Sequence, residues 1–410
     1  MKFFFPDAQD MIYPGYDFIN DEYPAHRVRQ RDDRYAHEVL RPTPYDGMLL
    51  SKAIVDGVGK ATGKYSQAQR DRLYRRGARK FFRLPESLSL LGDNGAFSYV
   101  DEDVPPVTVD EVLDFYELCG CDAGISVDHL ILAFDADPTL FVPDPDWIRR
   151  RDLTLELASQ FLSEARRRKS RVEPVGAAQG WSPQSYADSV GQLQDMGYDH
   201  VALGGMVPLK TKDIISTLRS VSEVLKPDTR LHLLGVARPE AMHEFVDLGV
   251  SSFDSTSPFR QAFMDDRKNY HTPDSHYVAI RVPQIEGNAR LKRRILAGEI
   301  DQASAIRLER ACLNNLRAFD RGQATESTVL ASLKEYEDLV DPGKTTYLHE
   351  YERTLRDHPW RNCSCQMCTR WGIDVVIFRG TERNKRRGFH NISVLAQQVP
   401  GRPRLMTEAQ

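Results

Sequence analysis

Residues 174–205 read PVGAAQGWSPQSYADSVGQLQDMGYDHVALGG, and this stretch decides the fold. Its first apolar run, Pro174–Ala178, predicts a strand. Ser182-Pro183 then starts a helix that ends at Gly197, because serine favours the helix N-cap, proline the first turn and glycine the position past the end. A second strand, His200–Leu203, follows. Parallel strands need such helical crossovers, so the stretch is typical of a parallel α/β fold.

The same strand–loop–helix unit recurs on both sides of this stretch. Short apolar runs that predict further strands lie at Leu88–Leu91, Gly124–Val127, Leu231–Leu234 and Val250–Phe253. Thr108 and Glu111 form a capping box that opens a helix between the first two runs, and Pro239 opens another between the last two. Repetition of the unit predicts a (β/α)8 barrel of the TIM type, whose chemistry lies at the strand ends. The alternative is a doubly wound open sheet, but no G-x-G-x-x-G follows a first strand.

The rest of the chain divides into further parts. Residues 1–84 are rich in Pro, Tyr, Asp and Arg and predict an N-terminal extension packed on the barrel, whose main part is residues 85–284. Residues 285–345 are charged and poor in strand formers, so they predict an inserted helical subdomain. Residues 346–410 hold a cysteine cluster and predict a zinc-binding subdomain together with the C-terminal end of the barrel.

Length and charge limit the classes of protein. The 410 residues carry 55 Lys+Arg and 59 Asp+Glu, a formal net charge of −4, which excludes a histone-like polycation but not a local basic surface. No uncharged apolar stretch reaches the roughly 18 residues of a membrane span. The opening MKFFFPD is too short an apolar run for a signal peptide. We therefore expect a cytoplasmic protein.

The cysteines are clustered in a way that predicts a metal site. Cys363, Cys365 and Cys368 fall close together, and His390 follows. Three thiolates and an imidazole suit tetrahedral Zn²⁺, and four protein ligands would fill the coordination shell, so the ion would be structural. The alternatives are three free cysteines with a chance histidine, or an open catalytic zinc site that lacks one of these ligands.

Three aspartates, Asp93, Asp128 and Asp254, each follow a predicted strand. A single aspartate there is commonly a helix cap or a turn residue. Three at one barrel rim are harder to dismiss, because two carboxylates that face one sugar can divide the work: one attacks the anomeric carbon and the other shuttles a proton. The residue types alone do not choose among the reactions that such a pair supports.

Six motifs occur in order along the chain: Asp93-Asn94-Gly95-Ala96-Phe97, Gly176-Ala177-Ala178-Gln179-Gly180, Gly204-Gly205-Met206, Leu234-Gly235-Val236, Gly249–Arg260, and the C-x-C-x-x-C of Cys363–Cys368 with a distant His390-Asn391. Each motif is weak by itself. Together, over about residues 88–395, they resemble the motifs of the tRNA-guanine transglycosylase superfamily, and their spacing fits a barrel.

The resemblance implies roles for individual residues. Asp254 matches the nucleophile that attacks C1′ of a nucleoside and releases guanine, after which the covalent glycosyl-enzyme accepts a 7-deazaguanine base. Asp93 matches the general acid/base that protonates the leaving guanine and later takes a proton from the incoming base. The base-binding residues that it implies are Asp128, Gln179, Gly205, Phe97 and Leu234. Among these, Asp128 would read the amino and ring N–H edge, and Phe97 would stack on the base unless it is a core residue.

Several departures from the family pattern concern the nucleic acid. At four positions this chain differs from the residue that is usual in the family. Ser98 replaces a glutamine, Leu130 a cysteine, Phe263 a second arginine and Lys210 a glutamate. Barrel chemistry is thus kept while contacts to an anticodon loop look altered. With the N-terminal extension, this pattern resembles the branch that acts on DNA and inserts 7-cyano-7-deazaguanine as part of a DNA-modification and restriction system.

The implied partners are therefore DNA, 7-cyano-7-deazaguanine and other proteins of the DNA-modification cluster, with a homodimer as a further expectation because family enzymes are often dimeric. Arg260, Lys385, Arg386 and Arg387 are expected to contact nucleic acid, although a solvated helix face would also explain the basic run. One alternative function is a tRNA-guanine transglycosylase that makes queuosine- or archaeosine-type tRNA. Another is a non-catalytic nucleic-acid-binding accessory subunit, against which intact Asp93 and Asp254 argue.

Overall fold

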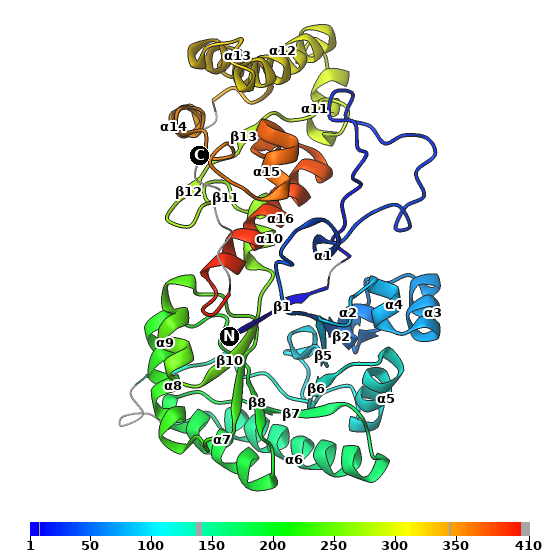
Figure 1. Cartoon of the computed structure of the whole chain (residues 1–410), viewed down its shortest axis with the longest axis vertical. Coiled ribbons are helices and arrows are strands. Elements are labelled where there is room, and N and C mark those ends of the chain that lie inside the picture. The colour runs from blue at the N-terminus through cyan, green and yellow to red at the C-terminus, as the bar shows by residue number, and fades with distance from the viewer. Residues whose placement is uncertain (8, 137–141, 344–345, 403–410) are drawn as a thin grey trace. The chain divides into compact units, whose positions relative to one another are not determined.

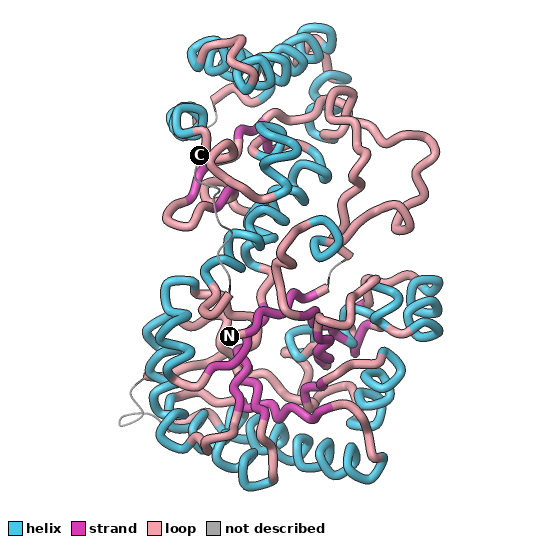
Figure 2. The backbone as a smooth tube through the Cα atoms, in the orientation of Figure 1, coloured by secondary structure: helices cyan, strands magenta, loops and turns pink. Residues whose placement is uncertain are grey.

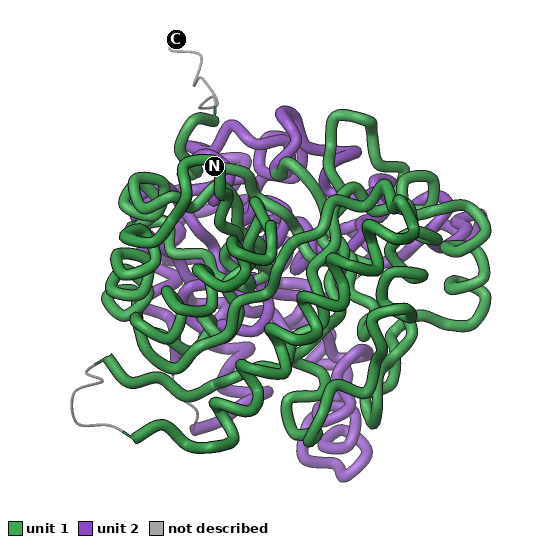
Figure 3. The backbone as a smooth tube through the Cα atoms, turned by 90° about the horizontal axis from the view of Figure 1, so that it is seen from below, with its two compact units in different colours: residues 1–9, 45–256, 398–402 green, residues 10–44, 257–397, 403–410 purple. Residues whose placement is uncertain are grey.

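The computed structural model describes residues 1–7, 9–136, 142–343 and 346–402. The chain forms two compact units, coloured green and purple in Figure 3. The described part of unit 1 comprises residues 1–7, 9, 45–136, 142–256 and 398–402, and that of unit 2 comprises residues 10–44, 257–343 and 346–397. The chain therefore leaves unit 1 and returns to it twice, so no single cut in the sequence would separate the two units.

Unit 1 is a closed barrel of parallel strands (Figures 1 and 2). In order around the barrel the strands are β1 (Lys2–Pro6), β2 (Gly47–Ser51), β5 (Ser89–Asp93), β6 (Ala123–Ile125), β7 (Glu173–Ala178), β8 (His200–Leu203), β9 (Arg230–Leu233) and β10 (Val250–Asp254), which pairs again with β1. Because neighbouring strands are parallel, their C-terminal ends meet at one rim. The predicted barrel is confirmed.

Helices that connect the strands cover the outside of the barrel. They are α2 (Lys52–Val55), α3 (Gln67–Arg76), α4 (Ala78–Phe82), α5 (Val109–Cys119), α6 (Pro145–Arg168), α7 (Pro183–Met196), α8 (Thr211–Val224) and α9 (Met242–Asp247), with the short 3₁₀ helices η1 (Ala96–Tyr99) and η3 (Pro239–Ala241) and a two-strand pair of β3 (Gly57–Val58) and β4 (Ala61–Thr62). The predicted caps are present: Thr108 and Glu111 form the capping box of α5, and Ser182 caps α7.

Apolar side chains fill the barrel interior. They come from six strands and are Phe4, Leu49, Leu91, Ile125, Val175, Ala177 and Ala202. Side chains along a strand alternate between faces, so Asp93, two residues after Leu91, also faces the interior. On β9 and β10, His232 is in register with both Ala202 and Ser252. His232, Ser252 and Asp254 therefore share the interior face.

The expectation that residues 1–84 are an extension on the barrel is wrong, because they supply two of its strands. β1 lies between β10 and β2, and Phe4 is in register with Asp254 on one side and with Gly47 on the other. Residues 10–44, which separate these strands in the sequence, belong to unit 2. The barrel also ends near residue 256 rather than 284, and residues 398–402 return to unit 1.

Unit 2 is mainly helical. Its helices are α1 (Ala36–Val39), α10 (Ser257–Met264), α11 (Ala289–Leu296), α12 (Gln302–Asp320), α13 (Glu326–Val340), α14 (Leu348–Asp357), α15 (Gln366–Trp371), η4 (Gly372–Val375) and α16 (Gly380–Gln398). Two-strand pairs join β11 (Tyr270–His271) to β12 (His276–Tyr277) and β13 (Ile280–Arg281) to β14 (Ile377–Phe378). Helices α11 to α13 confirm the helical segment expected between residues 285 and 345.

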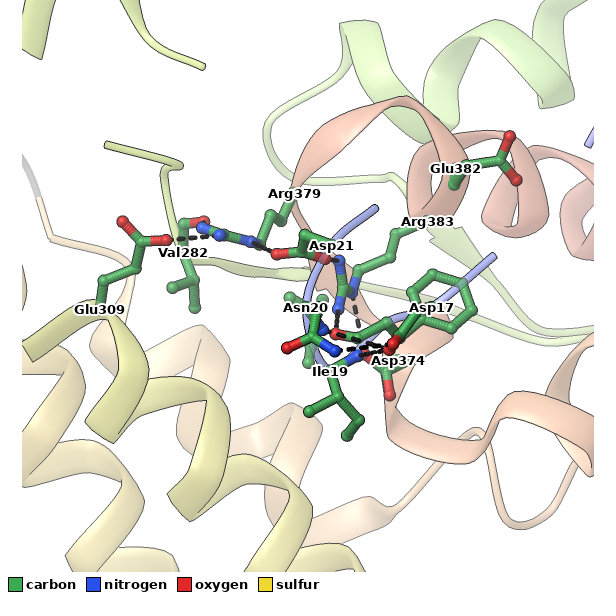
Figure 4. A network of polar contacts seen from close by, with 12 residues as sticks. Asp17, Ile19, Asn20, Asp21, Val282, Glu309, Asp374, Arg379, Glu382 and Arg383 are labelled. Carbon is green, nitrogen blue, oxygen red and sulfur yellow. Dashed lines mark hydrogen bonds and ion pairs between the residues drawn. The ribbon is translucent and has the colours of Figure 1, made fainter. Parts of the chain in front are cut away.

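Buried ion pairs hold the N-terminal loop of unit 2 to its C-terminal part (Figure 4). Asp21 accepts a hydrogen bond of 2.6 Å from Nε of Arg379 and also pairs with Arg383. Arg383 in turn donates to Asp374 at 2.9 Å, and Arg379 pairs with Glu309. The buried guanidinium groups of Arg379 and Arg383 therefore each have two carboxylate partners, which offset the cost of burying their charge. No helix in the described part of the chain has both the length and the apolar character needed to cross a membrane.

Candidate active site and metal centre

Asp254 ends strand β10 and is 6% exposed. Its Oδ1 accepts a hydrogen bond of 2.9 Å from the backbone N–H of Gly235, and Nε2 of His232 lies 3.2 Å from the same oxygen. No hydrogen bond reaches Oδ2 from the described residues. Oδ1 is thus held in place, and Oδ2 has lone pairs that are available to react with a substrate.

His232 was not predicted as a site residue. It is fully buried on β9, and its Nδ1 lies 2.8 Å from Oγ of Ser252. The Phe4 ring packs against the imidazole with ring centroids 5.9 Å apart. The sequence does contain a signal for this residue, because His232 is the one polar side chain in the run Leu231–Leu234. A polar side chain inside a barrel needs a hydrogen-bond partner, which points to a contact at this rim.

Asp93 ends strand β5 at the same rim. Burial raises the pKa of its carboxyl to about 7, and the negative charges of Asp128 and Asp254 add to this rise. Hydrogen bonds from the Ser51 side chain and the Gly95 backbone oppose it without cancelling it. The pKa of Asp93 is therefore near neutrality, which suits a group that must both give and take a proton.

The turn after Asp93 requires glycine at position 95. Gly95 has a φ of +91°, which side-chain-bearing residues rarely adopt. A Cβ atom here would also lie 2.4 Å from Cβ of Ala53 and 2.7 Å from Oγ of Ser51. Glycine therefore brings its backbone N–H close to Asp93, and a larger residue would displace the carboxylate.

Asp128 lies in the loop after β6 and is 2% exposed. Nδ2 of Asn94 donates to its Oδ1 at 2.9 Å, and Nε2 of Gln179 donates to its Oδ2 at 2.6 Å. Burial raises the pKa of Asp128, while these two amides oppose the rise. Asn94 is itself held by the Tyr99 hydroxyl, which donates to its Oδ1. The structure thus brings together Asp128 and Gln179, which were both predicted to bind the base. It adds Asn94 and Tyr99, whose closeness to Asp93 in the sequence was the available indication of a role in the site.

Gly204 and Gly205 close the loop after β8 onto Gln179. A Cβ atom at Gly204 would lie 2.1 Å from Nε2 of Gln179, so a larger residue there would displace the Gln179 amide. Oε1 of Gln179 accepts from the backbone N–H of Ile131 at 3.3 Å, which fixes the orientation of the amide. The Tyr186 hydroxyl donates to the Gly204 carbonyl at 2.8 Å. The glycine pair therefore gives a close backbone approach beside the Asp128–Gln179 contact.

Two further predicted base-binding residues differ in their surroundings. Phe97, in η1, is 55% exposed, so core packing does not account for it. Leu234 is half-buried and packs against the apolar barrel core. Stacking of Phe97 on a base and contact of Leu234 with a base both stay predictions.

The expectation that Arg386 and Arg387 contact nucleic acid is wrong in this structure, because both have 0% exposure within unit 2. Arg387 donates from Nη2 to the carbonyl of Ala262 at 2.6 Å, and Arg386 pairs with Glu382. Both guanidinium groups therefore bind partners inside unit 2, and neither is exposed for contact with a phosphate.

The other two predicted nucleic-acid contacts remain accessible. The Arg260 side chain is exposed on α10, and its Nε lies 3.4 Å from Sδ of Met264. The Lys385 side chain is 23% exposed, with Nζ 3.9 Å from a carboxylate oxygen of Asp10. Their contact with nucleic acid stays a prediction.

Four side chains of unit 2 form a group that could hold a metal ion: Cys363, Cys365, Cys368 and His390. Their ligand atoms all lie within 4.8 Å of one another. Nδ1 of His390 is 3.5 Å from Sγ of Cys363 and 3.4 Å from Sγ of both Cys365 and Cys368. Metal–sulfur bonds of about 2.3 Å and metal–nitrogen bonds of about 2.05 Å at tetrahedral angles give a sulfur–nitrogen separation of about 3.5 Å.

Strand β11 orients the histidine ligand. Nε2 of His390 lies 2.7 Å from the carbonyl oxygen of His271, so Nε2 carries the proton and the lone pair of Nδ1 faces the thiols. The Tyr270 ring stacks on the imidazole with ring centroids 4.1 Å apart, and its hydroxyl lies 3.1 Å from Sγ of Cys368. Neither supporting residue was predicted, since both lie far from the cysteines in sequence.

Comparison with known proteins adds an independent finding. A family model described as queuine tRNA-ribosyltransferase matches residues 64–304, which include Asp93, Asp128 and Asp254. A DNA-guanine transglycosylase of Salmonella montevideo is 48% identical over 404 residues, 97% of this chain and 96% of that protein. A queuine tRNA-ribosyltransferase of Desulfosudis oleivorans is 27% identical over 197 residues, 45% of this chain and 48% of that protein.

Proposed function

The chain belongs to the queuine tRNA-ribosyltransferase family and is a guanine transglycosylase, and we propose that it replaces guanine in DNA with a 7-deazaguanine base through a covalent intermediate on Asp254. The observation that supports this most is a pair of carboxylates at one barrel rim in different surroundings. Asp254 has one oxygen anchored and one oxygen without a partner among the described residues, while the pKa of Asp93 is raised to about 7. A nucleophile beside a proton donor of near-neutral pKa is the arrangement that base exchange needs.

In the first half of the reaction, Oδ2 of Asp254 attacks C1′ of the target nucleoside. The C1′–N9 bond breaks, its electron pair passes to the leaving guanine, and protonated Asp93 supplies the proton. The negative charge of Asp254 helps to keep Asp93 protonated at this stage. Asp93 is thus prepared as an acid while the nucleophile is still free.

In the second half, the nitrogen of the incoming base attacks C1′ and the C1′–Oδ2 bond breaks. Its electron pair returns to the Asp254 carboxylate, and the proton of the incoming base passes to Asp93. Because Asp254 carries no charge as an ester, one of the causes that raise the pKa of Asp93 is absent at this stage. Asp93 therefore changes from acid to base as the intermediate forms.

Base recognition is assigned to the loops after β5, β6, β7 and β8. Asp128 accepts from the amino and ring N–H edge of the guanine-type base, since each of its oxygens can accept a second hydrogen bond beside those from Asn94 and Gln179. Gln179 and the Gly205 backbone contact the carbonyl side of the base, and Leu234 lines the site. The exposed Phe97 ring stacks on the base after the base has been flipped out of the nucleic-acid helix.

We assign DNA as the polymer, with tRNA as the alternative. The relative named for DNA-guanine exchange is 48% identical over nearly the whole chain, whereas the relative named for tRNA is 27% identical over less than half of it. Ser98, Leu130, Phe263 and Lys210 depart from the tRNA-enzyme pattern, which supports the same choice. The proposed incoming base is 7-cyano-7-deazaguanine, and the setting is a DNA-modification and restriction system with partner proteins. A homodimer stays a prediction.

We propose Zn²⁺ as the ion of the Cys363, Cys365, Cys368 and His390 site, because a group of three cysteines and one histidine at tetrahedral spacing is a typical zinc set. When bound, the ion cross-links the α15 segment to α16 and supplies no open position for chemistry. His271 and Tyr270 hold the His390 ring in the orientation that this requires.

Parallel assays on the two polymers test this function. Plasmid DNA and unmodified tRNA, each labelled in guanine, are incubated with the enzyme and 7-cyano-7-deazaguanine, and released guanine is counted. We expect release from DNA that is lost in Asp254→Asn. Release from tRNA alone would replace the proposed substrate by the alternative, and release that persists in Asp254→Asn would contradict the mechanism.

A further inference from the structure

We propose that His232 is a positioning residue that holds the Asp254 carboxylate by Oδ1 and makes it a better leaving group when the sugar–enzyme bond breaks. This inference rests on the proposed function. It concerns a residue that the reaction as described above does not use. It explains why a polar side chain lies fully buried inside the otherwise apolar run Leu231–Leu234.

The register of two neighbouring strands creates the contact. His232 on β9 is in register with Ser252 on β10, and Asp254 lies two residues further along the same face of β10. The imidazole therefore lies between the two side chains, with Nδ1 2.8 Å from Oγ of Ser252 and Nε2 3.2 Å from Oδ1 of Asp254. A slip of one residue in this register would place His232 on the opposite face of the sheet from Ser252 and Asp254.

The partners fix the tautomer of the imidazole. An ionised carboxylate only accepts hydrogen bonds, so Nε2 must carry the proton that points to Asp254. Nδ1 of a neutral imidazole is then an acceptor, which the Ser252 hydroxyl satisfies as a donor. The Phe4 ring packs on the imidazole, and no surface of His232 is exposed. Both nitrogens are therefore paired and the ring is held in one orientation.

Two donors on Oδ1 have a chemical consequence. The N–H of Gly235 and Nε2–H of His232 both point at this oxygen, so the lone pairs of Oδ2 are the ones available to C1′. In the glycosyl-enzyme Oδ1 is an ester carbonyl oxygen, a weaker acceptor than a carboxylate. As C1′–Oδ2 breaks and its electron pair spreads over both oxygens, the hydrogen bond from His232 strengthens. Its loss therefore slows breakdown of the intermediate.

The test measures formation and decay of the covalent protein–DNA adduct in single turnover. Plasmid DNA is the substrate and unlabelled guanine is the incoming base, so that the exchange is symmetrical. His232→Leu removes the donor, whereas His232→Gln places an amide N–H near the position of Nε2. His200→Leu is the matched control, because His200 lies on neighbouring strand β8 and contacts Glu173 at 3.0 Å instead of Asp254.

We expect the adduct of His232→Leu to decay about 10- to 100-fold more slowly than that of the wild type, the range for loss of one hydrogen bond to a charged group. His232→Gln should recover most of the rate, and His200→Leu should match the wild type. Decay of the His232→Leu adduct at the wild-type rate would overturn the inference. Equal slowing in His232→Gln and His232→Leu would also overturn it, since the imidazole would then matter for packing alone.

A second variant keeps the inference testable if His232→Leu does not fold. Ser252→Ala retains the imidazole but removes the hydroxyl that fixes its tautomer, and it should slow decay of the adduct about 3- to 10-fold, as expected for a neutral hydrogen bond. Unchanged decay would overturn the inference while leaving the proposed function standing. Absence of any adduct in the wild-type protein would instead overturn the proposed function, and this inference with it.

Discussion

Asp93 and Asp254 end strands β5 and β10 at the same rim of one barrel, and the negative charge of Asp254 contributes to raising the pKa of Asp93. In the proposed reaction, this electrostatic relationship links the two halves. Formation of the proposed sugar ester would remove the charge of Asp254, which lowers the pKa of Asp93 and favours the later return of Asp93 to its role as a base. The two residues are therefore best understood as a coupled pair.

The first prediction concerns pH. Attack needs protonated Asp93, whose pKa is about 7, so the rate of adduct formation should fall as the pH rises above about 7, toward tenfold per pH unit. Asp128→Asn removes a negative charge that raises this pKa, so it should move the falling limb to lower pH. Single-turnover rates at saturating DNA between pH 5.5 and 9 measure both. A falling limb that does not move in Asp128→Asn would contradict this assignment.

The second prediction concerns stability. The pKa of Asp93 is about 7 in the folded protein against an ordinary 3.8, so its contribution to stability is fully present below about pH 4 and is lost as the pH rises through 7. Asp93→Asn removes the titration and should be more stable than the wild type at pH 8, by up to roughly 4 kcal/mol, and by much less at pH 4. Thermal unfolding at both pH values measures this. Asp199→Asn, at an exposed carboxylate of unit 1, is the control and should show no such pH-dependent gain.

The third prediction concerns the metal centre. Purified protein should contain one zinc per chain, and Cys365→Ser should lose it and lower the melting temperature, because the ion links α15 to α16. Cys312→Ser is the matched control, since buried Cys312 donates to the Ser332 carbonyl and lies outside the cluster. Metal analysis and thermal unfolding measure the difference. Full zinc content in Cys365→Ser would contradict the assigned ligand set.

The fourth prediction concerns the ion pairs of unit 2. Asp21→Asn leaves the buried Arg379 and Arg383 short of a carboxylate partner, so it should destabilise the protein by about 3 kcal/mol. Asp32→Asn breaks a pair with the exposed Arg31 and should cause little change. Urea unfolding followed by fluorescence compares the two variants. Equal stability of both would show that the buried network does not hold residues 10–44 in place.

The parts of the fold that local signals specify could be predicted from the sequence. Strand β8 and helix α7 are among them, because Ser182, Pro183 and Gly197 mark the helix ends within a few residues. Strands β1 and β2 were missed. Their place in the barrel depends on pairing with β10 and β5, far along the chain, and no helix of the repeating unit directly follows β1.

The candidate site shows the same division. Asp93, Gln179 and Asp254 were predicted because each stands in a short local motif, and Asp128 because it follows a predicted strand. The contact of His232 with Asp254 arises from strand register, which a local pattern does not reveal. The basic run that includes Arg386 and Arg387 suggested a charged surface, but this part of α16 is buried and its guanidinium groups satisfy internal carbonyl and carboxylate oxygens.

The central claim is that Oδ2 of Asp254 becomes covalently bound to C1′ of the nucleoside. The most direct measurement incubates the protein with guanine-bearing DNA, denatures the mixture and identifies the modified peptide by mass spectrometry. We predict a DNA-derived sugar on the peptide that contains Asp254, present in the wild type and absent in Asp254→Asn. An adduct on another residue, or base exchange that proceeds in Asp254→Asn, would contradict the claim.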